Sequence, residues 1–403
     1  MKLFYIGSIC AAKVFEKTVA GSRIAPSGAP QAFEGALLKG FAAIEDVELE
    51  AMSTESIAPF PYGNRHLLKP REDVVAGGVK VAIASAVNLP VLKQMGHARS
   101  VGRKLRKWLK ANAAEQKAVL LYGVYPTVAK RVDKLCKKYD CKSIVVVTDV
   151  PETMLTYSKP KYAIKRWLGQ YNKNMALKVQ SLFDGYVYIT RQMEKLVAPG
   201  KPYQITEILV DPDIIDESSD VTKSERRVLM YAGTLYKKYG IDKILQVWEN
   251  LKVDTDLWIC GSGDYEEEIK RKAAEDNRIK FFGRLSREEV LRLEQQATLL
   301  LNIRNPEDDY TLYSFPSKMI EYMLTATPMY TTKLPGIPLE YYDYIYLAEN
   351  YTIESMAGDI DRIMSQSQEK LDAFGQKASK FARENKNCYV QTQKIISFIK
   401  TLI

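Results

Sequence analysis

The sequence predicts an α/β protein made of two doubly wound parallel-sheet domains, and three observations lead to that prediction. First, 403 residues are too many for one ordinary domain and suit two of roughly 150–200 residues each. Second, short runs that are apolar almost throughout alternate with helical patterns, as expected of strands buried on both faces of a parallel sheet. Third, the polar stretch DPDIIDESSDVTKSERR at 211–227 separates the two halves and is the best linker candidate.

The second half follows this alternation most clearly. The expected strands are 227–233, 257–263, 279–283, 298–303, 328–332 and 344–349. The expected helices lie near 239–251, 265–275, 287–297, 318–326 and 353–365. Because the strand candidates are nearly continuous apolar runs, we expect a sheet that is covered by helices on both faces.

The first half repeats the pattern less cleanly. The expected strands are 3–6, 47–52, 79–84, 118–123, 143–148, 185–190 and 205–210, and the expected helices lie near 30–44, 126–139 and 160–180. We therefore expect an N-terminal domain over 1–220 and a C-terminal domain over 221–384, with a last helix at about 385–403 that packs back on the first domain. Ligands of such sheets bind beyond the carboxyl ends of the strands, so a cleft shared by the two domains is the expected site.

Composition narrows the class of protein. The formal charge of +9 favours partners with negative charge, namely phosphate-bearing ligands, an anionic membrane surface or nucleic acid. The five cysteines are scattered, and the nearest pair, Cys136 and Cys141, lacks CxxC spacing, so we expect neither disulfides nor a structural metal site. No signal peptide is evident, and no apolar run approaches the ~20 residues of a membrane span. These features predict a cytoplasmic protein.

The stretch SFPSKMIEYMLTATP at 314–328 is the most informative part of the sequence. Its apolar residues fall at helical spacing and Pro316 suits a helix entry, so we expect a helix from about Ser317. The free amides and the dipole of such a helix start favour an anion, and Lys318 adds a positive charge. Glu321 is expected in the first turn. Taken alone, the segment also fits a helix in which Glu321 complements the dipole and Ser317 is only a cap.

Two glycine-containing loops follow strands in the same half. In YAGTLYKKYG (231–240), Gly233 ends the strand, and Lys237 and Lys238 follow on a loop that either reaches a phosphate or is a solvated basic turn. In CGSGDYEEEI (260–269), Gly261 either lets the backbone approach a ligand closely or makes a tight strand–helix turn. Neither loop identifies a ligand by itself.

These segments, in this order, resemble the C-terminal domain of retaining family-four glycosyltransferases (glycosyl transferases group 1), which have the GT-B architecture of two Rossmann-like domains facing a cleft. The matching landmarks span Tyr231 to Tyr341 and are YAGTLYKKYGI, LWICGSGD, IKFFGRL and SFPSKMIEYMLTATPMYTTKLPGIPLEY. The first half matches only in outline, with a strand, a small-residue loop that includes Ser27 and Gly28 as acceptor-side candidates, and a helix. The resemblance implies a retaining hexosyltransferase that uses a nucleotide sugar, UDP- or GDP-linked, and no further cofactor.

The resemblance also assigns roles to residues of the second half. In the family, a helix glutamate binds the ribose hydroxyls, and Glu321 holds that position; a carboxylate suits the task because it can accept from two neighbouring hydroxyls at once. The amides of the preceding loop hold the diphosphate, and a turn after a strand meets the nucleobase. The residues implied for donor binding are Gly233, Thr234, Gly261, Gly283, Arg284, Leu285, Ser314, Phe315, Ser317 and Lys318.

The sequence departs from the family pattern within the donor domain. Tyr313 stands where the family keeps another glutamate, which contacts hydroxyls of the donor sugar. Thr234 and Tyr239 replace the usual arginine and lysine. We therefore expect Lys238 as a catalytic group that binds phosphate, with Lys237 as the alternative, and we expect the nucleotide to be better specified than the sugar.

Acceptor-side features lie in the first half. Asp149 ends the strand in SIVVVTD, which makes it a catalytic candidate on the acceptor side or a turn residue before a proline. The segments Arg99–Lys110 and Lys161–Lys178 combine basic faces with apolar stripes, which suits helices lying on an anionic membrane or surface helices packed on the core. In the first segment the stripe consists of Val101, Leu105, Trp108 and Leu109.

Together these features predict a transferase that builds a cell-surface polysaccharide or glycolipid on a lipid-linked glycan acceptor, either in the cytoplasm or held peripherally at the inner face of the plasma membrane. Two alternatives stay open: a GT-B sugar-nucleotide epimerase, and an accessory subunit without catalysis, which the replacement of the first glutamate would fit. Nucleic acid is not an expected partner, because the basic stretches lack interleaved aromatic side chains.

Overall fold

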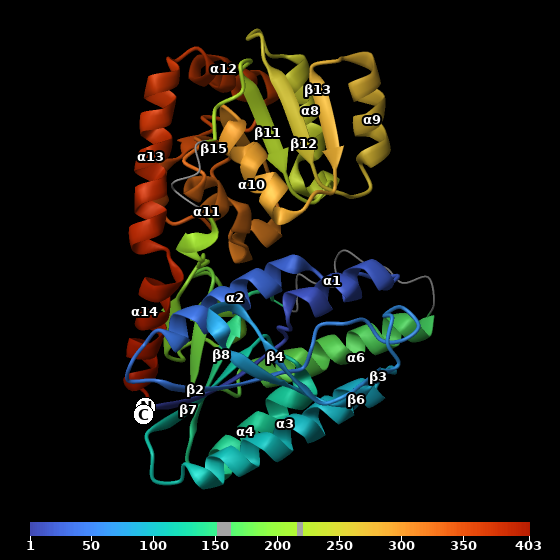
Figure 1. The fold of residues 1–403 in the computed structure, drawn as a ribbon, viewed down its shortest axis with the longest axis vertical. Coiled ribbons are helices and arrows are strands. Elements are labelled where there is room, and N and C mark those ends of the chain that lie inside the picture. The colour runs from blue at the N-terminus through green and yellow to red at the C-terminus, as the bar shows by residue number, and fades with distance from the viewer. Residues whose placement is uncertain (151–162, 216–220) are drawn as a thin grey trace. The chain divides into compact units, whose positions relative to one another are not determined.

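The computed structural model describes residues 1–150, 163–215 and 221–403, and it divides into two compact units (Figure 1). Unit 1 comprises Met1–Asp211 and Cys388–Ile403, and unit 2 comprises Pro212–Asn387. The division after Asp211 lies at the start of the expected linker rather than at residue 220, and the last helix begins within unit 1 at Cys388. Residues 216–220 of that linker lie outside the described part of the chain.

Unit 1 contains an eight-stranded sheet with the order β10-β9-β8-β7-β1-β2-β5-β4. Its strands are β1 (Lys2–Gly7), β2 (Glu48–Ser53), β4 (Arg71–Val74), β5 (Lys80–Ile83), β7 (Lys117–Tyr122), β8 (Lys142–Val147), β9 (Gly185–Tyr188) and β10 (Tyr203–Ile205). Every neighbouring pair is parallel except β4–β5. A separate antiparallel pair joins β3 (Leu67–Leu68) to β6 (Ala86–Val87).

Helices cover both faces of this sheet (Figure 1). The unit 1 helices are α1 (Ala12–Gly21), α2 (Gly28–Ala42), α3 (Leu92–Ala111), α4 (Pro126–Lys138), α6 (Ala163–Gln180), α7 (Met193–Val197) and α14 (Cys388–Lys400). Alternate residues of β1 show the two layers, because Leu3 and Tyr5 share a core with α2 and α14, whereas the Phe4 ring lies 5.2 Å from that of Trp108 on α3. This alternation places the core on both sides of the sheet.

The strand expected at 205–210 is wrong in position. β10 ends at Ile205, and the apolar run that follows packs into the core instead, with Leu209 and Val210 buried. The carbonyl of Val210 accepts from the amide of Cys388, so this segment pairs with the start of α14 rather than with the sheet. The start of α14, and not a neighbouring strand, therefore provides a hydrogen-bond partner for the backbone of this segment.

For the apolar stripe of the first basic segment, the structure supports the second of the two interpretations, a surface helix packed on the core. Val101, Leu105, Trp108 and Leu109 are all buried, so this side of α3 packs against unit 1 and only its basic side remains at the surface. In the second segment, Lys161 and the side chains at 163–169 and 171–172 lie outside the described residues. Among the described helices, none combines the length and the hydrophobicity that crossing a bilayer requires.

Unit 2 contains a six-stranded, fully parallel sheet with the order β13-β12-β11-β14-β15-β16. Its strands are β11 (Val228–Ala232), β12 (Asp256–Cys260), β13 (Ile279–Gly283), β14 (Leu299–Asn302), β15 (Met329–Thr331) and β16 (Tyr346–Leu347). Its helices are α8 (Ile241–Glu249), α9 (Glu266–Glu275), α10 (Arg287–Gln296), α11 (Ser317–Leu324), α12 (Ile353–Met364) and α13 (Gln368–Asn385). The strand order reverses between β11 and β14, and ligands of such sheets bind at that point, beyond the strand ends.

Candidate functional site

The loops that follow β11 and β14 meet at this reversal point of unit 2. Gly240 adopts φ +82°, and a β-carbon added there would lie 1.6 Å from the carbonyl oxygen of Ile303, so only glycine allows the two loops to touch. The hydroxyl of Tyr310 donates to the carbonyl of Lys238 at 2.7 Å. The loop that carries Lys237 and Lys238 is therefore fixed against the loop that leads to α11.

The turn after β12 joins the same place. Gly261 has φ +142°, and a β-carbon on it would lie 1.8 Å from the carbonyl oxygen of Gly233. Its amide donates to the carbonyl of Gly283 at 2.8 Å. Three of the glycines predicted for donor binding thus lie together at the carboxyl ends of β11, β12 and β13. Arg284 and Leu285 follow directly and lead into α10.

The segment Ser314–Lys318 forms the entry to α11. Phe315 is buried against the Tyr341 ring, while the helix begins at Ser317 with Pro316 as its cap residue. The amides of Ser317 and Lys318 belong to the first turn, where no intrahelical acceptor exists. Met319 already donates to the Pro316 carbonyl at 2.9 Å. The entry can therefore offer backbone N–H groups to an anion, as expected from the sequence.

The charges around α11 differ from the expectation in two ways. Glu321 lies in the second turn, because the first turn of α11 contains no acidic residue. Lys318 does not present a free ammonium: its Nζ donates to Glu294 Oε1 on α10 at 3.0 Å and to Glu321 Oε1. Lys318 therefore holds Glu321, and the direct contact with phosphate that the sequence suggested for Lys318 stays a prediction.

Glu321 is held from a second direction as well. The guanidinium of Arg287, the first residue of α10, donates to Glu321 Oε2 at 3.3 Å. The Glu321 side chain is 13% exposed, whereas Arg287 is 47% exposed and Glu294 is fully buried. The carboxylate is thus fixed between two cations at the surface, and it lies close to the turn that contains Arg284.

Burial and charge act against each other in this cluster. Burial raises the pKa of Glu294 to about 7, although the Lys318 charge opposes the shift. For Glu321, burial acts to raise the pKa, but the charges of Lys318 and Arg287 outweigh it and lower the pKa. Burial acts to lower the pKa of Lys318, and the charges of Glu294 and Glu321 raise it. The arrangement keeps Glu321 ionised and able to accept hydrogen bonds.

The remaining donor-side residues line the surface of the same loops. Lys237 is exposed, with its Nζ 3.8 Å from Asp242 Oδ2. The Lys238 ammonium lies 4.8 Å from the centre of the Tyr239 ring. Thr234 is exposed, and Tyr313 is half-buried at the end of a 3-10 helix that starts at Asp309. The structure places these side chains on the loops after β11 and β14, where the sequence located them.

The reversal point of unit 1 carries a different polar cluster. The strand order changes direction between β1 and β7, and there Glu34 of α2 is fully buried. Its carboxylate accepts from the Tyr5 hydroxyl at 2.8 Å, from the Ser8 amide at 2.8 and 3.1 Å, and from the Ser8 hydroxyl at 2.5 Å. Burial raises the pKa of Glu34 to about 7, and the Ser8 hydrogen bonds oppose the shift.

The acceptor-side candidates lie near this edge of unit 1. Asp149 follows β8 and accepts from the Thr148 hydroxyl at 3.3 Å, and burial raises its pKa. Ser27 is the N-cap of α2 and accepts from the Ala29 amide at 3.4 Å, while Gly28 is the first residue of that helix. The structure thus puts Ser27 and Gly28 at the end of the helix that carries Glu34.

Three residues of these clusters were not found from the sequence: Glu34, Arg287 and Glu294. For the two glutamates a signal existed, because each occupies the apolar face of its helix: Glu34 is four residues before Leu38, and Glu294 is three residues after Leu291. A carboxylate on a buried face must be compensated by partners. Arg287 gave no such signal, since it is an ordinary exposed residue of a helix start.

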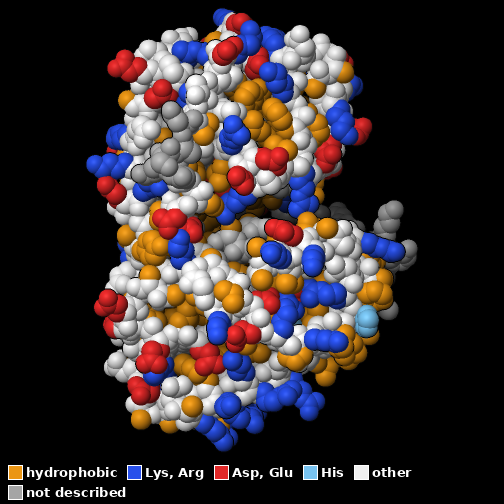
Figure 2. Space-filling view, in the orientation of Figure 1, with side chains coloured by type: hydrophobic (Ala, Val, Ile, Leu, Met, Phe, Trp, Pro, Cys, Tyr) orange, Lys and Arg blue, Asp and Glu red, His pale blue; other side chains and the backbone are white. Residues whose placement is uncertain are grey.

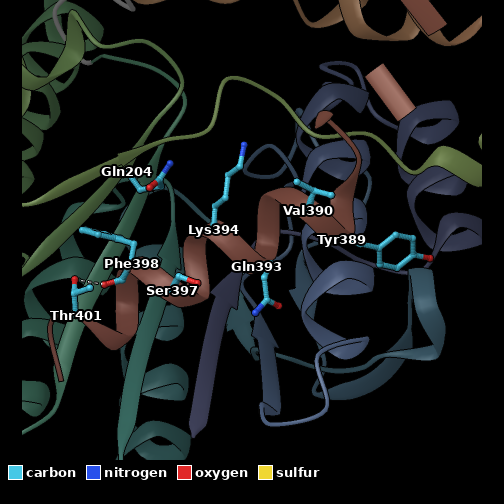
Figure 3. A pocket seen from close by; sticks show the side chains of 8 residues that line it. All are labelled: Gln204, Tyr389, Val390, Gln393, Lys394, Ser397, Phe398 and Thr401. Carbon is cyan, nitrogen blue, oxygen red and sulfur yellow. Dashed lines mark hydrogen bonds between the residues drawn. The ribbon is translucent and has the colours of Figure 1, made fainter. Parts of the chain in front are cut away.

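A surface groove of about 780 Å³ lies elsewhere on unit 1, along α14 and the edge strand β10 (Figure 3). Figure 3 shows that Gln204 comes from β10 and that Lys394, Ser397 and Phe398 come from α14. Lys394 is its one charged lining residue, and the groove lacks the carboxylates of the two sheet-end clusters. In the described residues, no group of three or more His, Cys, Asp or Glu side chains is arranged to hold a metal ion.

A comparison with protein families gives a match that lies within unit 2. Residues 214–381 match the family model described as glycosyl transferases group 1. Unit 2 is a glycosyl transferases group 1 domain. A search of curated proteins gave no match to the sequence. The match covers the loops after β11, β12 and β14, the turn after β13 and the whole of α11, so the cluster around Glu321 belongs to the glycosyltransferase domain.

Solved structures share the fold over the whole chain. Sucrose-phosphate synthase from Thermosynechococcus elongatus is similar with a TM-score of 0.66 and 11% identity, covering 100% of this chain and 99% of that one. Anabaena Alr3699/HepE, in complex with UDP and glucose, is similar with a TM-score of 0.63 and 13% identity, covering 100% of both chains. WaaG, a glycosyltransferase involved in lipopolysaccharide biosynthesis, gives 0.59 and 14%, covering 98% and 99%. The predicted GT-B fold is thereby confirmed, and the match to glycosyl transferases group 1 covers residues 214–381.

Proposed function

We propose that this glycosyltransferase is a retaining hexosyltransferase that binds a UDP- or GDP-linked sugar in unit 2 and transfers the sugar to a lipid-linked glycan. The observation that carries the proposal is Glu321, an ionised carboxylate fixed by Lys318 and Arg287 beside the loops at the reversal point of the unit 2 sheet. A similar fold, Anabaena Alr3699/HepE, was solved with UDP and glucose, which supports a nucleotide-sugar donor here.

In this proposal each part of the unit 2 site contacts a different part of the donor. Glu321 accepts hydrogen bonds from the two ribose hydroxyls, for which a fixed carboxylate is well suited. The backbone around Gly283, Arg284 and Leu285 meets the nucleobase. The amides at the entry of α11 bind the diphosphate, together with Lys238.

The chemical step requires stabilisation of the charge that develops on the diphosphate as the bond to the sugar breaks. Backbone amides, the start of α11 and the Lys238 ammonium supply positive potential at fixed positions, which is the efficient way to stabilise such charge. The acceptor oxygen attacks the anomeric carbon from the face that the diphosphate leaves, and the hydroxyl proton passes to the departing diphosphate. This route retains the anomeric configuration, and it needs no protein nucleophile.

Unit 1 is proposed to bind the acceptor. Asp149 and the Ser27–Gly28 helix start lie toward the carboxyl-end edge of its sheet, where ligands of this fold class bind. WaaG and the lipopolysaccharide galactosyltransferase WaaB share the fold, which supports a role in cell-surface polysaccharide or glycolipid synthesis on the cytoplasmic side of the membrane.

A thermal-shift panel of UDP-, GDP-, ADP- and dTDP-sugars tests the donor assignment, because a donor raises the melting temperature by mass action. The sugar nucleotide that binds is then incubated with a membrane lipid extract, and transfer is followed by radiolabel. A shift with a UDP- or GDP-sugar, followed by labelled lipid, supports the proposal. Binding without transfer indicates an accessory subunit, turnover of the donor alone indicates an epimerase, and no shift with any nucleotide overturns the donor site.

A further inference from the structure

Unit 1 exposes an unusual amount of apolar surface in one place. Of the fourteen large hydrophobic side chains that the described residues expose, nine lie between residues 60 and 95. Eight of these nine, all except Val74 of β4, form what we call the apolar patch: Phe60, Tyr62, Leu67, Val87, Leu89, Val91, Leu92 and Met95. Val91 and Met95 are the most exposed of them, at 60% and 59%. Apolar clusters of this kind mark interaction surfaces in soluble domains.

Backbone pairing holds the segments of the apolar patch in place. Leu67 and Val87 are opposite each other in the β3–β6 pair, and the Phe60 amide donates to the Asn88 carbonyl at 2.8 Å. The Met95 amide donates to the Val91 carbonyl at 3.1 Å, which ties the start of α3 to the loop before it. Figure 2 shows hydrophobic side chains gathered in the region where Figure 1 labels β3 and β6, with Lys and Arg side chains next to them.

The backbone at the centre of the apolar patch is strained. Val91 adopts φ +67°, a left-handed conformation that a β-branched residue rarely takes. The free-energy cost of this conformation is not offset by burial of the side chain, because Val91 is exposed to solvent. Strain that the fold maintains at an exposed apolar residue is typical of functional surfaces.

A cationic concavity adjoins the apolar patch. It has a volume of about 390 Å³ between α3 and α4 and is lined by Ala98, Arg99, Thr127, Lys130, Arg131 and Lys134. In the described part of the chain, no carboxylate forms an ion pair with any of its four cations. Four like charges on a concave surface repel one another unless an anion binds between them.

The exposed side of α3 connects the two features. Leu92 and Met95 form its apolar beginning, and Arg99, Arg103 and Arg106 continue along it at spacings of three or four residues. These positions lie on one side of the helix over roughly 21 Å, at ~1.5 Å per residue. The buried stripe of α3 faces the other way, into the core. The helix therefore offers the surface a short apolar end followed by a row of cations.

We propose that the apolar patch and the cationic concavity together form a docking surface for an anionic lipid bilayer. The patch enters the boundary between headgroups and acyl chains, and Arg99, Lys130, Arg131 and Lys134 contact lipid phosphates. We choose this occupant because its chemistry is complementary to the surface. A bilayer with anionic lipids has an apolar layer for the apolar patch and, directly beside that layer, phosphates for the four cations. The inference goes beyond the proposed function and does not depend on the donor site in unit 2.

Vesicle co-sedimentation of the full chain tests the docking surface. Two sets of vesicles are compared, phosphatidylcholine alone and phosphatidylcholine with about 30% phosphatidylglycerol, a fraction chosen to give a strong negative surface. The first variant carries Leu92→Ser and Met95→Ser, and its matched control is Leu339→Ser, which removes a residue of unit 2 that is 76% exposed. The second carries Arg99→Gln, Lys130→Gln and Lys134→Gln, and its control carries Lys243→Gln and Lys370→Gln.

We expect the wild-type chain to bind the anionic vesicles and not the neutral ones, with binding that weakens in high salt. Each test variant should bind at least tenfold more weakly, while both controls bind as the wild type does. Unchanged melting temperatures and unchanged nucleotide shifts show that the variants are folded. Equal binding to neutral vesicles, equal loss in the controls, or displacement of the protein from vesicles by millimolar inorganic phosphate, which would indicate a site for free anions, would each overturn the proposal.

Discussion

Each unit contains one fully buried glutamate of particular interest, and the two carboxylates are compensated by different kinds of partner. Glu34 in unit 1 and Glu294 in unit 2 are both fully inaccessible to solvent, and burial raises the pKa of each to about 7. Glu34 is satisfied by hydroxyl and amide donors from Tyr5 and Ser8. Glu294 instead binds the ammonium of Lys318 through Oε1, and its second oxygen, Oε2, is buried without a hydrogen bond.

The two clusters differ in whether their ion pairs and hydrogen bonds extend to the surface. Neutral donors from β1 and from Ser8, which follows it, fix Glu34 within its own unit, so its hydrogen bonds end in the core. The Glu294–Lys318 pair continues to Glu321 and then to the exposed Arg287, so a buried charge orients a carboxylate that solvent and ligands can reach. We therefore interpret Glu34 as a structural group and Glu294 as a positioning residue for Glu321. The predictions below test that distinction, from the largest expected effect to the smallest.

The Glu321→Ala variant should have the largest effect. If the carboxylate accepts from two ribose hydroxyls, the variant loses two hydrogen bonds to a charged group, each worth about 1.5–3 kcal/mol, and kcat/KM should fall at least ~100-fold. Steady-state transfer kinetics measure this. The control is Glu369→Ala, an exposed glutamate of α13, which should stay within about twofold. Equal, small losses in both variants would show that Glu321 does not bind the donor.

The Glu34→Gln variant should change the pH dependence of stability. A carboxyl whose folded pKa is about 7 instead of the ordinary 4.5 keeps its proton in the folded state when the unfolded chain releases it. Stability is therefore highest below the ordinary pKa and declines as the pH rises toward 7, by on the order of 3 kcal/mol for this group.

Urea unfolding at pH 5 and pH 8 measures that decline for Glu34. The wild type should lose stability at pH 8, and Glu34→Gln should lose correspondingly less because the amide does not titrate. The control Glu45→Gln replaces an exposed glutamate of the same unit and should behave as the wild type does. The interpretation of Glu34 fails if the pH dependence of Glu34→Gln matches that of the wild type.

The Lys238→Ala variant should weaken transfer by about 10- to 100-fold, because one hydrogen bond to a charged phosphate is worth about 1.5–3 kcal/mol. The loss should be larger for a nucleotide diphosphate than for the nucleoside, which lacks the phosphates. Binding titrations with both probes measure the difference. Lys243→Ala, on the neighbouring helix α8, is the matched control. An equal loss for nucleoside and diphosphate would remove Lys238 from the phosphate site.

The Glu294→Gln variant should have the smallest effect on activity, but it tests most specifically whether Glu294 positions Glu321. With Glu294 neutral, the Lys318 charge is directed to Glu321 alone, which weakens the acceptance of ribose hydrogen bonds, and nucleotide affinity should fall about tenfold, or ~1.4 kcal/mol. Affinity should also lose its pH dependence between pH 6 and 8. Titration calorimetry at both pH values measures this. The comparison of the two glutamates fails if Glu34→Gln has the same effect on nucleotide binding.

The sequence predicted most of unit 2 because its strands are uninterrupted apolar runs with helices between them. It located Glu321 and the α11 entry through the resemblance of 314–328 to a family segment. It could not predict that Lys318 turns toward Glu294, because that depends on how α10 packs against α11. A sequence shows which charges exist, but burial and packing decide which of them meet.

Unit 1 was predicted less well, for a related reason. The short β3–β6 pair has only two residues in each strand, too few for an alternating pattern to be visible. The run 205–210 was expected to be a strand, but only Ile205 belongs to β10. Ile208 and Leu209 instead pack in the core to which α14 contributes, and α14 is far away in the sequence. The stripe on α3 was located correctly as apolar, yet only the fold reveals that it faces inward.

The central claim is that Glu321 recognises the donor through its ribose. It is tested most directly by titrating the wild type and Glu321→Gln with the nucleoside diphosphate of the donor that binds, and with its 2′-deoxy analogue. We predict that removal of the 2′-hydroxyl weakens binding to the wild type by about tenfold or more, since a hydrogen bond to a charged acceptor is lost. The same removal should change binding to Glu321→Gln by less than about threefold. An equal penalty in both proteins would contradict the account, because the hydroxyl would then be bound by another group.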